Sequence, residues 1–156
     1  MRSLPLLFSL LLALAAPPAL AQSDATTDPR EFSEAARQAY GRALRDARGL
    51  IAEKKYAEAI AVLDKLSAER PREPQARFLK GLALADSGQP DAAIVQLEIG
   101  MKEASGNAAV QLALGDAYLK AGRFQDARAA YEGVIKKDPV GPSGRQAAAK
   151  LKNIAK

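Results

Sequence analysis

Apolar and polar residues alternate along residues 29–156 with the spacing of amphipathic helices. Within each successive segment, apolar or small side chains recur three or four positions apart, and charged side chains fill the positions between them. Glycine and proline residues separate the segments, as expected where one helix ends and the next begins. The pattern predicts three pairs of helices followed by a seventh, so the expected fold class is all-α.

Capping signals mark the start of this helical region. Asp28 precedes Pro29, and Glu31 stands three positions after Asp28, which is the arrangement of a capped helix start. We therefore expect the first helix over residues 29–53. The last helix is predicted over residues 142–156, and its apolar side is expected to cover the end of the domain.

A second pattern is superimposed on the helical one, because similar residues return every 34 positions. Ala59, Ala93 and Ala127 are separated by this step, and so are Gly81 and Gly115. A fixed period of this length is typical of a stack of identical supersecondary units, in which neighbouring units bury a continuous core. We place the three units at residues 40–73, 74–107 and 108–141.

Small residues at fixed places in each unit are expected to have packing and capping roles. Gly81 and Gly115 should let paired helices approach closely. Gly88 and Gly122 should end the first helix of their units in a left-handed conformation. Gly100 replaces a small packing residue inside a predicted helix, which should cost about 0.5–1 kcal/mol relative to alanine.

The third unit carries the most specific motif in the chain. It contains, in order, Leu114-Gly115, Tyr118, Gly122, Phe124, Ala127, Tyr131 and Asp138-Pro139. This order resembles the tetratricopeptide repeat, a helical hairpin of 34 residues, and the resemblance covers all three units. It implies a solenoid of three helical hairpins with a C-terminal capping helix, in which Tyr118 and Tyr131 are structural. It also implies that the protein binds other proteins.

Residues 1–21 have the layout of a bacterial secretory signal peptide. Arg2 gives a positive start, residues 4–16 form an apolar run, and Ala21 ends an Ala-Leu-Ala sequence that a signal peptidase reads. A membrane anchor is the alternative, but the run is shorter than the roughly 20 residues needed to span a bilayer. We therefore expect cleavage near Ala21, a polar lead over residues 22–28, and a periplasmic or secreted protein.

Composition narrows the classes of function. The formal net charge is +5, but basic and acidic residues alternate along the repeats as on solvated helix faces, so we expect no nucleic-acid partner. The chain contains no cysteine and no histidine, which removes disulfides, the commonest general base and the commonest metal ligand. The sequence therefore predicts a protein that is not an enzyme and has no cofactor, no metal and no small-molecule substrate.

In tetratricopeptide arrays the first helices of the units line a concave groove, so the resemblance implies a binding site there. Phe78 and Leu112 are its expected anchors, and Asp116 is expected to pair with Lys120, four residues further along the helix. Bulky apolar side chains edged by charge are typical of an interaction site. Packing within the core is the alternative for each of these side chains. The candidate groove residues are Leu44, Arg48, Phe78, Leu82, Leu112, Asp116, Leu119 and Lys120, with Ile51, Gln75, Ala85 and Asp86 on the same face.

The predicted function is a non-catalytic scaffold of the bacterial cell envelope that binds a partner peptide or helix in this groove. The alternative is a self-associating structural subunit, a homo-oligomer that pairs through the alanine-rich residues 147–155. Tetratricopeptide domains that bind the C-terminal carboxylate of chaperones use a set of Lys, Asn and Arg side chains. Only one residue at the matching positions is charged here, so that clamp is not expected. The matching positions hold Leu44, Arg48, Leu79, Ala109 and Ala113.

Overall fold

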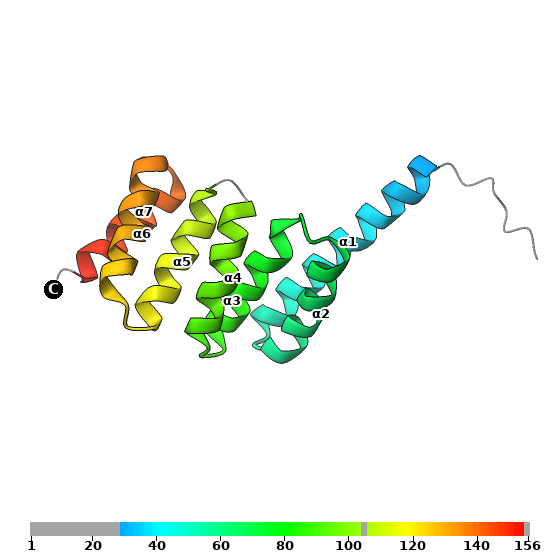
Figure 1. Ribbon diagram of the computed structural model, residues 1–156, viewed down its shortest axis with the longest axis horizontal. Helices are drawn as coiled ribbons and strands as arrows, with labels where there is room; N and C mark the ends of the chain where they lie inside the picture. The colour runs from blue at the N-terminus through cyan, green and yellow to red at the C-terminus, as the bar shows by residue number, and fades with distance from the viewer. Residues whose placement is uncertain (1–28, 104–105, 155–156) are drawn as a thin grey trace, which may run out of the picture.

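The computed structural model describes residues 29–103 and 106–154 of the chain, with side chains described from residue 33 onward. The expected signal peptide, the polar lead and the Asp28 cap lie outside these residues. Within the described residues the chain forms seven helices (Figure 1). The helices are α1 (Pro29–Ala52), α2 (Tyr56–Glu69), α3 (Pro74–Asp86), α4 (Pro90–Glu103), α5 (Ala108–Lys120), α6 (Phe124–Lys137) and α7 (Pro142–Ile154).

Proline and glycine residues set the boundaries of these helices. Pro74, Pro90 and Pro142 are each the first residue of a helix, where the missing N–H of proline removes no helical hydrogen bond. The turns after α3 and α5 contain Gly88 and Gly122, whose φ angles of 82° and 74° lie in the left-handed region that glycine adopts without strain. The predicted role of these two glycines as helix ends is confirmed.

Two further glycines let the helices of a unit pack closely. A Cβ atom at Gly81 of α3 would lie 2.5 Å from Leu97 Cγ on α4. A Cβ atom at Gly115 of α5 would lie 2.6 Å from Tyr131 Cε1 on α6. Both distances are too short for any real carbon contact, and Leu97 and Tyr131 are fully buried. The predicted close approach of the paired helices is therefore confirmed. Leu97 packs directly on Gly81, and Tyr131 packs directly on Gly115.

Three clusters of buried apolar side chains run along the stack. The first joins α1, α2 and α3, the second joins α3, α4 and α5, and the third joins α6 to α7 with half-buried side chains of α5 packed against it. Each helix thus packs against its neighbours in the chain, as in other repeat proteins whose stability is the sum of nearest-neighbour interfaces. This stack of three helical hairpins and a final helix confirms the predicted all-α fold class.

The two ends of the stack differ. At the C-terminal end, α7 packs against α6 and α5 and buries Ala147 completely, so this residue is not free to contact a second copy. At the N-terminal end, α1 has 24 residues whereas the other helices have 13 or 14. Figure 1 shows the N-terminal half of α1 extending beyond the rest of the stack. None of the described helices is long and apolar enough to cross a bilayer.

Candidate partner-binding site

The first helices of the three units, α1, α3 and α5, together with the final helix α7, each contact the next and form one face of the stack. We call this surface the first-helix face. Residues separated by 34 positions occupy equivalent places on it, because each unit repeats the geometry of the one before. Arg48, Leu82, Asp116 and Lys150 form one such row, which crosses the face from α1 to α7.

A pocket with a volume of about 310 Å³ opens on this face between α3, α5 and α7. We call it the first-helix pocket. Its floor is apolar, because the side chains of Leu82 and Leu119 are half-buried there beside the buried Ala85 and Ala113. The complete lining consists of Leu82, Ala85, Asp86, Ala113, Asp116, Leu119, Lys120 and Lys150.

Two ion pairs border the pocket, and each joins residues 34 positions apart. Lys120 Nζ lies 2.7 Å from Asp86 Oδ1 and also donates a hydrogen bond of 3.1 Å to the Ala85 carbonyl oxygen. Lys150 Nζ of α7 lies 2.9 Å from Asp116 Oδ1. The predicted pair of Asp116 with Lys120 is therefore wrong. Each lysine instead pairs with the acid one unit earlier, because neighbouring first helices bring equivalent positions side by side.

Asp116 is held from the core as well as from α7. Tyr131 donates a hydrogen bond of 2.6 Å from its hydroxyl to Asp116 Oδ1, the same oxygen that faces Lys150. Burial, together with this hydrogen bond and the nearby carboxylate charge, raises the pKa of Tyr131 above its ordinary value. A carboxylate with two donors on one oxygen acts here as a structural link between α5, α6 and α7. Among the described residues, no three His, Cys, Asp or Glu side chains are grouped as a metal site requires.

The structure brings together half of the candidate groove residues. Leu82, Asp116, Leu119 and Lys120 all line the first-helix pocket. Arg48 is exposed on α1 in the same row as Leu82, one unit away from the pocket.

The other three candidates belong wholly or partly to the core. Leu44 is only 5% exposed and packs in the first cluster with Leu63 and Leu79, so its place in the groove is corrected to a place in the core. Phe78 and Leu112, the expected anchors, are half-buried against the second and third clusters. They are not among the residues that line the first-helix pocket. The pocket instead offers Leu82 and Leu119 as its apolar contacts.

Two pocket residues, Ala113 and Lys150, are missing from the candidates that the sequence provides. The signal for Lys150 is present, because it stands 34 positions after Asp116. Extending the repeat into the last helix would have placed Lys150 on the same face. The helix α7 therefore has two roles. It covers the end of the stack, and its Lys150 closes one side of the first-helix pocket.

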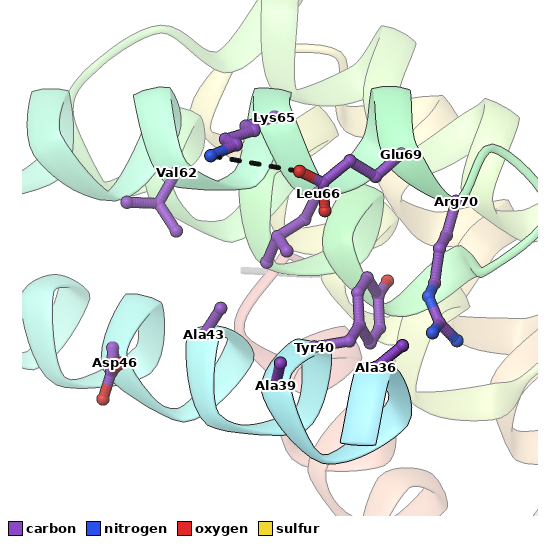
Figure 2. A pocket seen from close by; sticks show the side chains of 10 residues that line it. All are labelled: Ala36, Ala39, Tyr40, Ala43, Asp46, Val62, Lys65, Leu66, Glu69 and Arg70. Carbon is purple, nitrogen blue, oxygen red and sulfur yellow. Dashed lines mark ion pairs between the residues drawn. The ribbon is translucent and has the colours of Figure 1, made fainter. Parts of the chain in front are cut away.

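A second and larger groove lies between α1 and α2 at the N-terminal end of the stack, with a volume of about 610 Å³. We call it the terminal groove. Figure 2 shows three small side chains of α1 facing two apolar side chains of α2 across it, with charged side chains at its edges. The lining consists of Ala36, Ala39, Tyr40, Ala43, Asp46, Val62, Lys65, Leu66, Glu69 and Arg70.

Comparison with protein-family models matches the model described as tetratricopeptide repeat twice, at residues 50–103 and at residues 84–151. The two matches together cover more than half of the chain. The chain belongs to the tetratricopeptide repeat family. Tetratricopeptide repeat domains are protein-interaction modules and typically have no catalytic activity.

Solved structures with low sequence identity share this tetratricopeptide fold. The first TPR domain of the human RPAP3 protein is 17% identical, with a TM-score of 0.69 over 74% of this chain and 89% of that chain. The first TPR of Spaghetti (RPAP3), bound to the HSP90 peptide SRMEEVD, is 18% identical, with a TM-score of 0.68 over 76% and 91%. The type III secretion translocator chaperone SycD of Yersinia enterocolitica is 14% identical, with a TM-score of 0.73 over 83% and 94%. The search of curated proteins gave no match.

Proposed function

We propose that this tetratricopeptide repeat protein is a non-catalytic binding module of the bacterial cell envelope, and that it binds a segment of a partner protein in the first-helix pocket. The observation that carries the proposal is the pocket itself, where Leu82 and Leu119 form an apolar floor between two ion pairs. The envelope location is supported by the signal-peptide layout of residues 1–21.

The charges around the pocket favour an apolar ligand over a strongly charged one. Asp86 is already paired with Lys120, and Asp116 with Lys150. A charged ligand group would have to break one of these pairs, whereas an apolar side chain only displaces water from the leucine floor. We therefore expect the partner to insert one or two apolar side chains from an amphipathic helix or an extended segment.

A clamp for a C-terminal carboxylate is not part of the proposal. The neighbouring Spaghetti structure holds an HSP90 peptide that ends in glutamate, valine and aspartate. In this chain Leu44, Leu79 and Ala113 occupy clamp positions, and all three are buried and apolar. The general role is supported by the folds that the chain shares, which include a peptide-bound domain and a chaperone.

Substitution on the floor of the pocket tests the proposal. The full chain carrying Leu119→Asp is tagged and purified from the bacterium that makes it, and copurifying proteins are quantified by mass spectrometry. Burial of one apolar side chain contributes about 1.5–3 kcal/mol, so the specific partner should be depleted about 10- to 100-fold. The matched control is Val95→Asp on α4, because Val95 is 53% exposed and does not line the pocket.

Folding of the variants must be monitored, because Leu119 also packs against the third cluster. Equal helicity of both variants by circular dichroism shows that the pocket alone has changed. Lys120→Glu provides a second test, since it places a like charge beside Asp86 at an exposed position. If Leu119→Asp and Lys120→Glu both retain the same proteins as Val95→Asp, the pocket is not the binding site.

A further inference from the structure

The terminal groove is open because a small residue stands where later units have a long one. Position 43 is alanine, and its equivalents 34 and 68 residues further on are Arg77 and Gln111. Arg77 lies between α3 and α4, where it donates to Glu103 at 2.9 and 3.0 Å and to the Pro71 carbonyl oxygen at 2.8 Å. The Gln111 side chain occupies the place that a Cβ atom of Gly133 on α6 would take. In the first unit, Ala43 leaves the equivalent space between the helices empty.

The same end of the stack carries a helical segment without cover. Residues 33–39 of α1 are exposed except for the half-buried Ala36. They belong to the N-terminal half of α1, which extends beyond the rest of the stack (Figure 1). An isolated helix this short is marginal in water, because most helical stability in proteins comes from packing of an apolar face. One chain therefore offers both an unfilled groove and a helix that lacks a partner.

The residues of α1 that face the groove have a spacing that reads the same in both directions. Ala36, Ala39, Ala43 and Asp46 are separated by three, four and three positions. If α1 of a second copy lies antiparallel along the groove, each Ala39 faces Ala43 of the other copy, and each Ala36 faces Asp46. Alanine at these places permits a helix separation near the lower limit of about 8 Å. The exposed residues 33–39 then lie along residues 43–49 of the other copy.

The charges at the two ends of the groove are complementary under this pairing. Figure 2 shows Asp46 at one end and Arg70 at the other, where the Arg70 guanidinium lies 4.9 Å from the centre of the Tyr40 ring. Lys65 and Glu69 on the α2 edge pair with each other at 4.0 Å, whereas Asp46 and Arg70 take part in no ion pair among the described residues. An antiparallel partner would bring Asp46 of each copy to Arg70 of the other.

We propose that two copies of this chain pair through their terminal grooves, with the two α1 helices antiparallel about a two-fold axis near residue 41. Such an interface is self-complementary, because each copy provides the same helix and the same groove. The first-helix pocket is formed by α3, α5 and α7, so it stays open in the dimer. The proposal does not depend on the proposed function of that pocket.

Cysteine crosslinking tests the register, because the chain has no cysteine of its own. Full chains carrying Ala39→Cys are mixed with full chains carrying Ala43→Cys and are then oxidised. The expected product is a mixed disulfide dimer, identified by mass, in clear excess over the product of either chain alone, because a disulfide needs Cα atoms within about 7 Å. The matched control uses Ala57→Cys with Ala61→Cys, which have the same spacing at exposed positions of α2 outside the groove.

Sedimentation equilibrium over a range of concentrations tests the association itself. The wild-type chain should reach twice the monomer mass, and Ala39→Glu should raise the dimer dissociation constant by about tenfold or more, while Ala61→Glu should leave it unchanged. Asp46→Arg should weaken the dimer, and the addition of Arg70→Asp to the same chain should restore it. A wild-type chain that remains monomeric overturns the proposal. So does a dimer that Ala39→Glu does not weaken, since it must form through another surface.

Discussion

Replacement of Gly100 by alanine should stabilise the protein, whereas the same replacement at Gly115 should destabilise it. Both glycines are buried in the interior of a helix. A Cβ atom at Gly100 would lie 3.9 Å from Arg77 Cβ, which is an ordinary van der Waals distance. A Cβ atom at Gly115 would lie 2.6 Å from Tyr131 Cε1, which requires the ring to move.

The expected magnitudes follow from these distances. Alanine is better than glycine inside a helix by about 0.5–1 kcal/mol, and at position 100 nothing opposes this gain. At position 115 the same gain is opposed by overpacking, which costs about 1–3 kcal/mol in a filled core. Tyr131 has no room to yield, because its ring is fully buried and its hydroxyl is bonded to Asp116. The net loss of stability for Gly115→Ala should therefore be about 0.5–2 kcal/mol.

Urea unfolding followed by circular dichroism measures both changes. The midpoint should rise for Gly100→Ala and fall for Gly115→Ala, with the slope unchanged, since neither substitution alters the surface exposed on unfolding. In thermal unfolding, 1 kcal/mol corresponds to a shift of about 3–6 °C for a domain of this size. A lower midpoint for Gly100→Ala, or an unchanged one for Gly115→Ala, would refute the inference that these two glycines differ in how closely the paired helix packs on them.

Three further predictions concern the tyrosines and the last helix. Tyr131→Ala should lower the free energy of unfolding by about 3–5 kcal/mol in urea because the ring is fully buried, and Tyr118→Ala should cost less because its ring is only half-buried. Burial and the hydrogen bond to Glu98 raise the pKa of Tyr118 to about 12, so its contribution to stability should be complete below its ordinary pKa of 10.0 and should be lost as pH rises from there towards 12. Urea midpoints should fall less steeply across this pH range in Tyr118→Phe than in the wild-type protein. An equally steep fall in both proteins would contradict the raised pKa of Tyr118 as the cause. Lys150→Met should remove the partner of Asp116 and speed cleavage of α7 by a non-specific protease, with a change of only about 0–1 kcal/mol in global unfolding.

The fold was predictable from the sequence because the close packing of paired helices and the ends of the first helices both require small residues at fixed positions of each unit. Gly81 and Gly115 recur at the repeat spacing since a bulky side chain of the paired helix sits on each of them. Gly88 and Gly122 recur because each first helix ends in a left-handed residue. Such requirements are local to one unit, so a single chain shows them without any knowledge of the tertiary structure.

The site was predictable only in part, because exposure depends on which unit a residue occupies. Leu44, Phe78 and Leu112 are separated by 34 positions, yet Leu44 is buried and the other two are half-buried. The prediction that Asp116 pairs with Lys120 was wrong for a related reason. Lys120 has an acid four residues away in its own helix, but the acid of the neighbouring first helix lies close enough to pair with it.

The terminal groove could not be expected from any motif, because it results from a side chain that is missing. Only the structure shows that Arg77 and Gln111 fill, in their own units, the space that stays open beside Ala43 in the first unit. A sequence signal does exist, since a small residue stands at a position where both later units have a long polar one. Its meaning becomes clear only when α1 and α2 are seen to line the same groove.

Photocrosslinking from position 119 tests most directly whether the first-helix pocket binds a partner. A photoreactive amino acid replaces Leu119 in the full chain within the cells that make it, and position 95 on α4 serves as the matched control. We expect one abundant adduct from position 119, with the crosslink in an apolar segment of the partner and no such adduct from position 95. Equal labelling from both positions, or no adduct from position 119 in folded protein, would contradict binding in the pocket.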